Sequence, residues 1–234
     1  MQQVEFLHGV HEGLVNGAFR EPAPLKYRSL QLTGDEKLLA SLATTSLFGP
    51  GHLTLEMLAC LPSALPLAWE AVGEGGRVVI FENAGPFSIA RVVLSETAAR
   101  SYDLVAYGGG RSILAALGHL KTIERNVESI HYVGDLDYAG LDIAWNAGRC
   151  AMDLGLPTVL PATELHRQML LAAESFGHPQ GWPVQECFVD VDRARVLDVL
   201  SPDVRDQVDA ILKAGRRIPE EVLGPNELRR AWSA

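Results

Sequence analysis

The sequence predicts an α/β protein in which a parallel sheet is flanked by helices. After residue 76, short β-rich runs alternate with helical segments in the order β-α-β-α-β-α-β. Strands joined through helices form a parallel sheet that is covered on both faces. A glycine-rich stretch at residues 73–76 separates this region from a mostly helical one. The 234 residues are 47% hydrophobic and 21% charged, which is typical of globular proteins and excludes a disordered or fibrous chain.

Residues 1–75 predict a small, mostly helical N-terminal extension. A helix is expected to start within residues 33–36, where acidic residues can occupy its first turn, and leucines follow at helical spacing over residues 38–42. A threonine cap predicts a second, short helix over residues 54–58, and residues 25–32 predict a strand.

Residues 76–234 predict the α/β domain and a helical C-terminal tail. Four short apolar runs predict the strands of the sheet: residues 77–81, 104–107, 130–133 and 158–160. Pro86 predicts the first position of one helix, and Ser112 predicts the cap of another. A third helix is expected over residues 138–154, and two or three more are expected from Asp192 onwards.

Charge and cysteine content narrow the functional classes. The chain has 29 acidic and 20 basic residues and a net charge of −9, which argues against nucleic-acid binding by a basic surface alone. The negative net charge remains compatible with an enzyme that binds phosphates through metal ions. The three cysteines, Cys60, Cys150 and Cys187, have no C-x-x-C spacing, so we expect a reducing compartment, no disulfide framework and no cysteine zinc site.

We expect a cytoplasmic protein without a membrane partner. The first residues lack the basic and apolar regions of a signal peptide. The most apolar region, residues 38–69, is interrupted by glycine, proline and glutamate, so it cannot supply the roughly 20 apolar residues of a membrane span.

Carboxylates follow two of the predicted strands. Glu82 comes directly after the first strand, and Asp135 and Asp137 come directly after the third. The carboxyl ends of parallel strands lie on one edge of the sheet, where ligands bind, so we expect these side chains to converge. A divalent cation relieves their repulsion, and oxygen ligands suit Mg²⁺. The sequence therefore predicts a Mg²⁺ site, or alternatively a Mn²⁺ site, that is suited to phosphodiester hydrolysis by metal-activated water.

Simpler interpretations remain for each motif alone. A glutamate at a strand end is usually a cap or a solvated residue, and D-x-D also occurs in phosphatases and surface turns. A calcium loop is excluded because Ala139 and Asn146 stand where ligands are needed. The glycine triplet at residues 108–110 lacks both the G-x-G-x-x-G pattern and the lysine of a phosphate-binding loop. The seven histidines form no H-E-x-x-H motif and are assigned no role.

The strand-end Glu82, followed by Gly134-Asp135-x-Asp137-x-x-Gly140 in this βα order, resembles the Toprim domain of topoisomerases, primases and nucleases. Over a longer stretch, including Phe81-Glu82-Asn83 and Arg217-Ile218-Pro219-Glu220-Glu221, the chain resembles the JetD nuclease subunit of Wadjet plasmid-defence systems, a relative of the topoisomerase VI A subunit. The resemblance implies a Toprim-type sheet and a metal-dependent DNA endonuclease. It also implies an antiplasmid complex with a structural-maintenance-type ATPase and leaves a homodimer open.

The resemblance assigns the metal-binding and catalytic roles to Glu82, Asp135 and Asp137, and Glu82 is also expected to handle a proton. Asp142 is either functional or a favourable charge at the start of its helix. Glu221 is either a second-metal ligand or a surface residue. The basic C-terminal residues either contact phosphate or form a solvated face: Lys213, Arg216, Arg217, Arg229 and Arg230.

Two other functions stay open. The first is a non-catalytic Toprim module that holds DNA and assembles with the ATPase, and the second is an RNA-cleaving or phosphate-transferring Toprim enzyme. The intact acidic trio favours catalysis over the first alternative.

Overall fold

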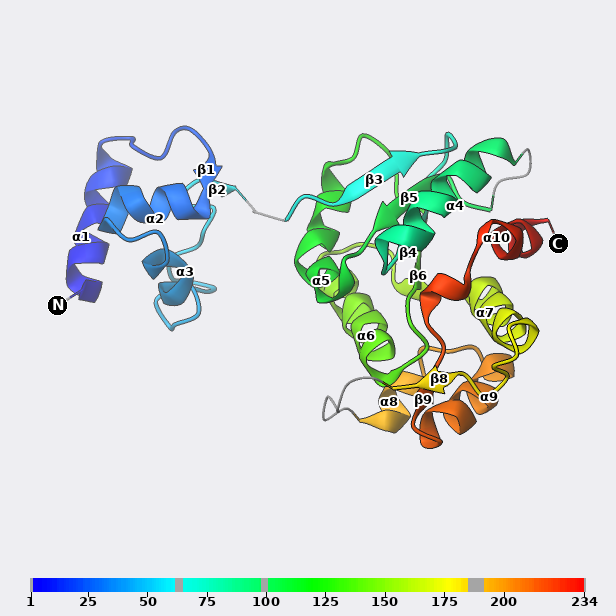
Figure 1. Ribbon diagram of the computed structural model, residues 1–234. Coiled ribbons are helices and arrows are strands. Elements are labelled where there is room, and N and C mark those ends of the chain that lie inside the picture. Colours follow the sequence, from blue (N-terminus) through cyan, green and yellow to red (C-terminus); the bar gives the residue numbers. More distant parts are fainter. Residues whose placement is uncertain (1, 62–64, 98–100, 185–191, 234) are drawn as a thin grey trace. The chain divides into compact units, whose positions relative to one another are not determined.

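The structure is a computed structural model that describes residues 2–61, 65–97, 101–184 and 192–233 (Figure 1). The chain divides into two compact units, Met1–Ser63 and Ala64–Ala234. In the described ranges, no helix is long and apolar enough to cross a membrane. Cys60 and Cys150 are free thiols, and Cys187 lies outside the described residues.

The N-terminal unit is mostly helical. Its helices are α1 (Gln2–Val15), α2 (Leu25–Thr33) and α3 (Leu38–Leu42), and β1 (Ala23–Pro24) pairs in parallel with β2 (Cys60–Leu61). The helices enclose a small core formed by Phe6, Val10, Leu39, Leu42 and Leu58.

Three predictions for this unit were wrong. The helix expected to start within residues 33–36 begins at Leu38, because α2 continues to Thr33 and Gly34 ends it in the left-handed conformation. Residues 25–32 form helix α2 rather than a strand, because this conformation buries the adjacent side chains of Arg28 and Ser29 and gives both of them hydrogen-bond partners. Arg28 donates to the carbonyl oxygen of Glu21 (2.7 Å), and Ser29 Oγ accepts the N–H of Leu39 (3.0 Å). Residues 54–58 form turns rather than a helix, although the Thr54 hydroxyl does accept the N–H of Met57 (3.3 Å).

The second unit is built on a five-stranded, mostly parallel sheet. Its strands are β3 (Ala68–Ala71), β4 (Arg77–Phe81), β5 (Leu104–Tyr107), β6 (Ser129–Val133) and β7 (Val159–Pro161). Their order is β3-β5-β4-β6-β7; β3 alone is antiparallel to its neighbour. The four predicted strands are confirmed to within a residue at either end, and β3 was not predicted.

Helices cover both faces of this sheet, as predicted (Figure 1). One face packs against α4 (Ala84–Glu96), α7 (Thr163–Ser175), α9 (Pro202–Lys213) and α10 (Pro225–Trp232). The other packs against α5 (Ile113–Ala116), η2 (Leu117–Thr122) and α6 (Tyr138–Asp153). Side chains alternate between the two faces along β4 because a strand has a period of two residues.

Smaller elements complete the unit: η1 (Gly110–Ser112), β8 (Trp182–Pro183), α8 (Arg193–Leu197), β9 (Arg216–Arg217) and η3 (Glu220–Val222). The predicted helical tail is confirmed by α8, α9 and α10, whereas α7 was not predicted. Pro86 lies in the first turn of α4, which begins two residues earlier than predicted. Ser112 is at the N-cap position of α5, but its side chain makes no capping hydrogen bond.

The strand order creates a switch point between β4 and β6. These strands are neighbours, but the chain leaves β4 through α4 towards β5 and leaves β6 through α6 towards β7. The two connections run in opposite directions and cover opposite faces of the sheet. Ligands of open α/β sheets bind in the crevice that opens at such a point, outside the carboxyl ends of the strands.

Candidate functional site

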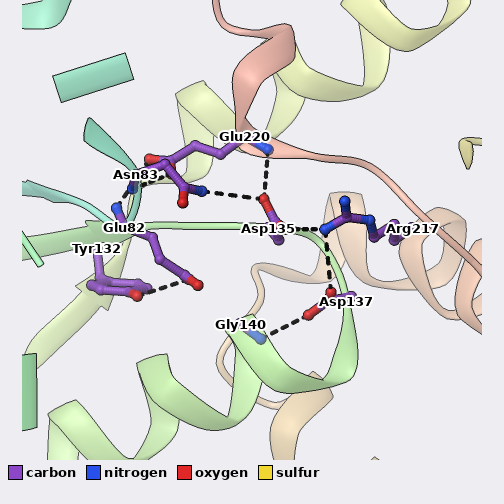
Figure 2. A network of polar contacts seen from close by, with 8 residues as sticks. All are labelled: Glu82, Asn83, Tyr132, Asp135, Asp137, Gly140, Arg217 and Glu220. Carbon is purple, nitrogen blue, oxygen red and sulfur yellow. Dashed lines mark hydrogen bonds and ion pairs between the residues drawn. The ribbon is translucent and has the colours of Figure 1, made fainter. Parts of the chain in front are cut away.

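Carboxylates flank the switch point (Figure 2). Glu82 directly follows β4, and Asp135 lies in the short loop between β6 and α6. Asp137 is the N-cap of α6, and its Oδ1 accepts the N–H of Gly140 (2.8 Å). The three predicted residues thus lie at one edge of the sheet, contributed by two adjacent strands.

Arg217 is the counter-ion of the two aspartates. Its Nη1 forms an ion pair with Asp135 Oδ2 and lies 3.9 Å from Asp137 Oδ2. The arginine comes from β9, far along the chain, and two backbone hydrogen bonds hold its segment against the β6–α6 loop. These bonds join Leu136 and Ile218 in both directions (2.9 and 3.2 Å). The C-terminal region therefore contributes a positive charge directly to this edge.

Glu220 ties the two strand ends together. Its side chain is fully buried. Oε1 accepts the N–H of Glu82 (3.1 Å), and Oε2 accepts the N–H of Asn83 (2.7 Å). Its own N–H donates to Asp135 Oδ1 (2.8 Å), so one residue fixes the backbone after β4 and the carboxylate after β6. We refer to Glu82, Asp135, Asp137, Arg217 and Glu220 together as the strand-end site.

Sequence reasoning missed Glu220 as part of the site and named Glu221 instead. The two glutamates are adjacent in the sequence, and only the path of the chain after Pro219 decides which one faces the sheet. Glu220 is the first residue of η3 and is buried, whereas Glu221 is exposed. The sequence feature that could have pointed to Glu220 is the pair of adjacent glutamates, Glu220 and Glu221, shortly after Arg217.

Burial and mutual repulsion raise the pKa values of Glu82, Asp137 and Glu220. The pKa of Glu82 rises from 4.5 to about 7, chiefly because its side chain is buried, and also because Asp135 and Asp137 repel its charge. The hydroxyl of Tyr132 donates to Glu82 Oε2 (2.9 Å) and opposes this rise. Burial likewise raises the pKa of Asp137, and burial raises the pKa of Glu220 to about 9.

The donors of the site suit a hard divalent cation. They are carboxylate oxygens, the ligand type that Mg²⁺ and Mn²⁺ prefer. Asp135 and its neighbouring acids repel one another, since Asp135 contributes to the raised pKa values of Glu82, Asp137 and Glu220 after the larger effect of burial, and a cation would relieve this repulsion. Glu82, Asp135 and Asp137 are the residues that would hold the ion.

The arrangement differs from an assembled metal site in one respect. Across the described residues, no group of three or more histidine, cysteine, aspartate or glutamate side chains is placed so that it could hold a metal ion. Asp135 instead directs one oxygen to Arg217 and the other to the N–H of Glu220. A cation at this position would have to take the place of Arg217 beside Asp135. The assignment of the three metal ligands therefore stays a prediction.

Two glycines are required by close contacts within the site. A Cβ on Gly134 would lie 2.1 Å from Glu82 Oε2, and a Cβ on Gly140 would lie 2.3 Å from the carbonyl oxygen of Asp135. Both distances are shorter than atomic contact allows. The glycines that frame the D-x-D motif are thus explained by packing against the acids themselves.

The other basic and acidic candidates have partners elsewhere. Four of the basic C-terminal residues bind acids or backbone carbonyls away from the site: Lys213 (Asp209), Arg216 (Gln180 and Gly181), Arg229 (Glu96) and Arg230 (Glu227). Asp142 is buried, and two arginines bind its carboxylate. Asp142 lies beyond the first turn of α6, so it is not the favourable charge at the helix start that the sequence suggested, and a functional role for it stays a prediction.

The free energy of unfolding of the metal-free protein should fall as pH rises from about 4.5 to about 7. The unfolded chain releases the Glu82 proton near its ordinary pKa of 4.5, whereas the folded chain holds it until about 7. The free energy of unfolding therefore falls across this window as the folded protein is forced to ionise Glu82, by about 3 kcal/mol in total for a shift of this size. Glu82→Gln should remove this part of the slope in urea titrations in EDTA at pH 5 and pH 8. Glu96→Gln, a change at an exposed carboxyl, is the control. Equal slopes in wild type and Glu82→Gln would contradict the prediction.

One known protein family matches the part of the chain that contains the three predicted acids. Residues 52–150 match the family described as Protein of unknown function C-terminus (DUF2399). The match spans β3 to most of α6, and it includes Glu82, Asp135 and Asp137 but neither Arg217 nor Glu220. No curated protein and no solved structure matches the chain. The family's description assigns no activity, so the functional argument rests on the site.

Proposed function

We propose that the chain is a metal-dependent DNA endonuclease of the Toprim class. The observation that carries the proposal is the strand-end site, where four acids gather at the switch point and Arg217 lies beside two of them, Asp135 and Asp137. Such a site attracts a divalent cation, and divalent cations are the usual means by which an acidic protein approaches a phosphodiester. The order of Glu82 and the D-x-D motif along the sheet, which resembles Toprim domains, is consistent with this proposal.

The residues of the site have distinct roles in the proposed reaction. Glu82, Asp135 and Asp137 would bind the cation, which supplies Lewis-acid chemistry and an activated water. Tyr132 orients the Glu82 carboxylate through its hydroxyl. Glu220 fixes the backbone that carries Glu82. Glu82 is also the carboxyl that would accept a proton from the attacking water or return one to the leaving oxygen; in the absence of a cation its pKa is raised to about 7.

The wider assignment rests on the resemblance to the JetD subunit. On that basis the chain is the nuclease subunit of an antiplasmid complex, and a structural-maintenance-type ATPase delivers the DNA. The net charge of −9 supports the need for such a partner, because a strongly acidic protein gains little from long-range attraction to DNA.

A second candidate function is a non-catalytic Toprim module that assembles with the ATPase. The ion pair between Arg217 and Asp135 favours it, because an acid that is neutralised by a fixed arginine needs no metal. The two functions differ in whether a divalent cation binds and whether cleavage follows.

The test is a cleavage assay with supercoiled plasmid, linear duplex DNA and RNA, each in Mg²⁺, Mn²⁺ or EDTA. We expect DNA cleavage in either ion and none in EDTA. Cleavage of RNA alone would replace the proposed substrate. An intact plasmid at high enzyme concentration, together with a melting temperature that neither ion changes, would support the non-catalytic module.

A further inference from the structure

Two arginines converge on one buried aspartate beside the strand-end site. Asp142 is the fifth residue of α6, and 7% of its side chain is exposed. Its Oδ2 is 3.1 Å from Arg111 Nη1, and its Oδ1 is 2.9 Å from Arg195 Nη2. Arg111 belongs to η1, which follows β5, and Arg195 belongs to α8. One carboxylate thus holds guanidinium groups from two separate segments.

Aromatic rings hold further arginines in the same region. The guanidinium of Arg195 lies 4.1 Å from the centroid of the Trp145 ring, and that of Arg149 lies 5.1 Å from the same centroid. Arg193 lies 5.1 Å from the centroid of the Tyr138 ring. Stacking on a ring attracts the guanidinium through its face and leaves N–H groups at its edge for other acceptors. We refer to Arg111, Arg149, Arg193 and Arg195 as the arginine cluster.

The arginine cluster adjoins the candidate active site. The N–H of Gly109, two residues before Arg111, donates to the carbonyl oxygen of Glu82 (3.1 Å). Asp142 lies in the same helix that Asp137 caps. The segments that carry Arg111 and Asp142 therefore both begin at the carboxyl edge of the sheet, η1 after β5 and α6 after β6.

Within the described ranges, two acids contact the arginines of the cluster. Asp142 pairs with Arg111 and Arg195, and Asp192, the N-cap of α8, accepts the backbone N–H of Arg195. Arg149 and Arg193 form no ion pair with any described residue. Most other arginines in the second unit bind an acid one to one. The Arg111 side chain is 62% exposed, whereas that of Asp142 is 7% exposed, so the arginine stays open to solvent while one of its nitrogens neutralises the buried acid.

We propose that the arginine cluster binds the sugar–phosphate backbone of the duplex DNA that the strand-end site cleaves. This inference rests on the proposed function, since it names the surface that holds the substrate. Guanidinium forks bind phosphate oxygens with two parallel hydrogen bonds. Contacts of this kind position a duplex without reading its sequence. The cluster is a local positive surface on a chain whose net charge is negative.

The test measures binding of a fluorescently labelled DNA duplex to the full chain by anisotropy, in EDTA so that no cleavage occurs. Arg111→Gln and Arg149→Gln alter exposed side chains and should each weaken binding by about fivefold, with the salt slope reduced by about one per lost phosphate contact. Arg167→Gln is the matched control. Arg167 is also an exposed arginine held by acids, Glu164 (2.9 Å) and Asp203 (2.6 Å), but it lies on α7. We expect this variant to bind like wild type.

The outcomes separate this inference from the proposed function. If Arg111→Gln and Arg149→Gln bind DNA like wild type, or if wild type binds no duplex at low salt, the cluster is not the DNA site. Tighter binding of an RNA duplex than of a DNA duplex would also overturn the assignment. If the variants bind weakly but wild type cleaves nothing in Mg²⁺ or Mn²⁺, the cluster stands and the nuclease proposal fails.

Discussion

Asp135→Asn should lower metal-dependent DNA cleavage by at least about 100-fold, and Asp135→Ala should abolish it. Asparagine keeps the shape of the side chain and an oxygen that can accept the N–H of Glu220, now 2.8 Å from Asp135 Oδ1. It removes the negative charge that would bind the cation. The fold should therefore survive while the chemistry is lost, as measured by plasmid cleavage and circular dichroism on the same preparations.

Both variants remove the charge that neutralises Arg217, so both should melt earlier than wild type. Asp135→Ala also removes the acceptor of the Glu220 N–H, so it should melt earliest and needs a separate control. Asp209→Asn alters an aspartate that pairs with Lys213 outside the site (2.6 Å), and it should cleave like wild type. Full activity in Asp135→Asn, where wild type cleaves, would remove Asp135 from the proposed mechanism.

Local patterns in the sequence predicted the sheet well. The runs at residues 77–81 and 104–107 are short, apolar and bounded by glycine or polar residues, and each is a strand. The sequence also holds a helical pattern over α7, which was not predicted. Leu165, Met169 and Ala172 recur at helical spacing and are buried in the core.

Tertiary contacts decided the parts that local patterns could not predict. Residues 25–32 have leucines at positions compatible with a strand, and the burial of Arg28 and Ser29 within the N-terminal unit selects a helix. The strand-end site depends on hydrogen bonds over long separations along the chain. Glu220 binds Asp135 across 85 residues and binds Glu82 across 138. No local spacing specifies such a pairing, so the sequence supplied the acids after the strands but not the residues that hold them.

Magnesium should stabilise the wild-type protein against thermal and urea unfolding. At a concentration 100 times its dissociation constant, the gain should be about 2.7 kcal/mol, provided that the unfolded chain does not bind the ion. Part of the binding energy is used to replace Arg217 beside Asp135, so a high dissociation constant is expected. Melts in EDTA and in increasing Mg²⁺ measure both quantities.

Asp137→Asn should lose most of this gain without loss of metal-free stability. The pKa of Asp137 is raised because the carboxyl is buried and close to Asp135, so its ionised form opposes folding at neutral pH and a neutral amide relieves the repulsion. The side chain also caps α6 by accepting the N–H of Gly140, and asparagine is as good an N-cap as aspartate.

Asp137→Ala separates the two roles of this residue. It removes the cap and should cost about 1 kcal/mol in EDTA, whereas Asp137→Asn should be as stable as wild type or more stable. Both variants should gain much less from Mg²⁺ than wild type does. Equal gains in wild type and Asp137→Asn would mean that Asp137 caps the helix and does not bind the ion. The strand-end site would then have to hold its cation through Glu82 and Asp135, or hold none and keep Arg217 as its permanent counter-ion.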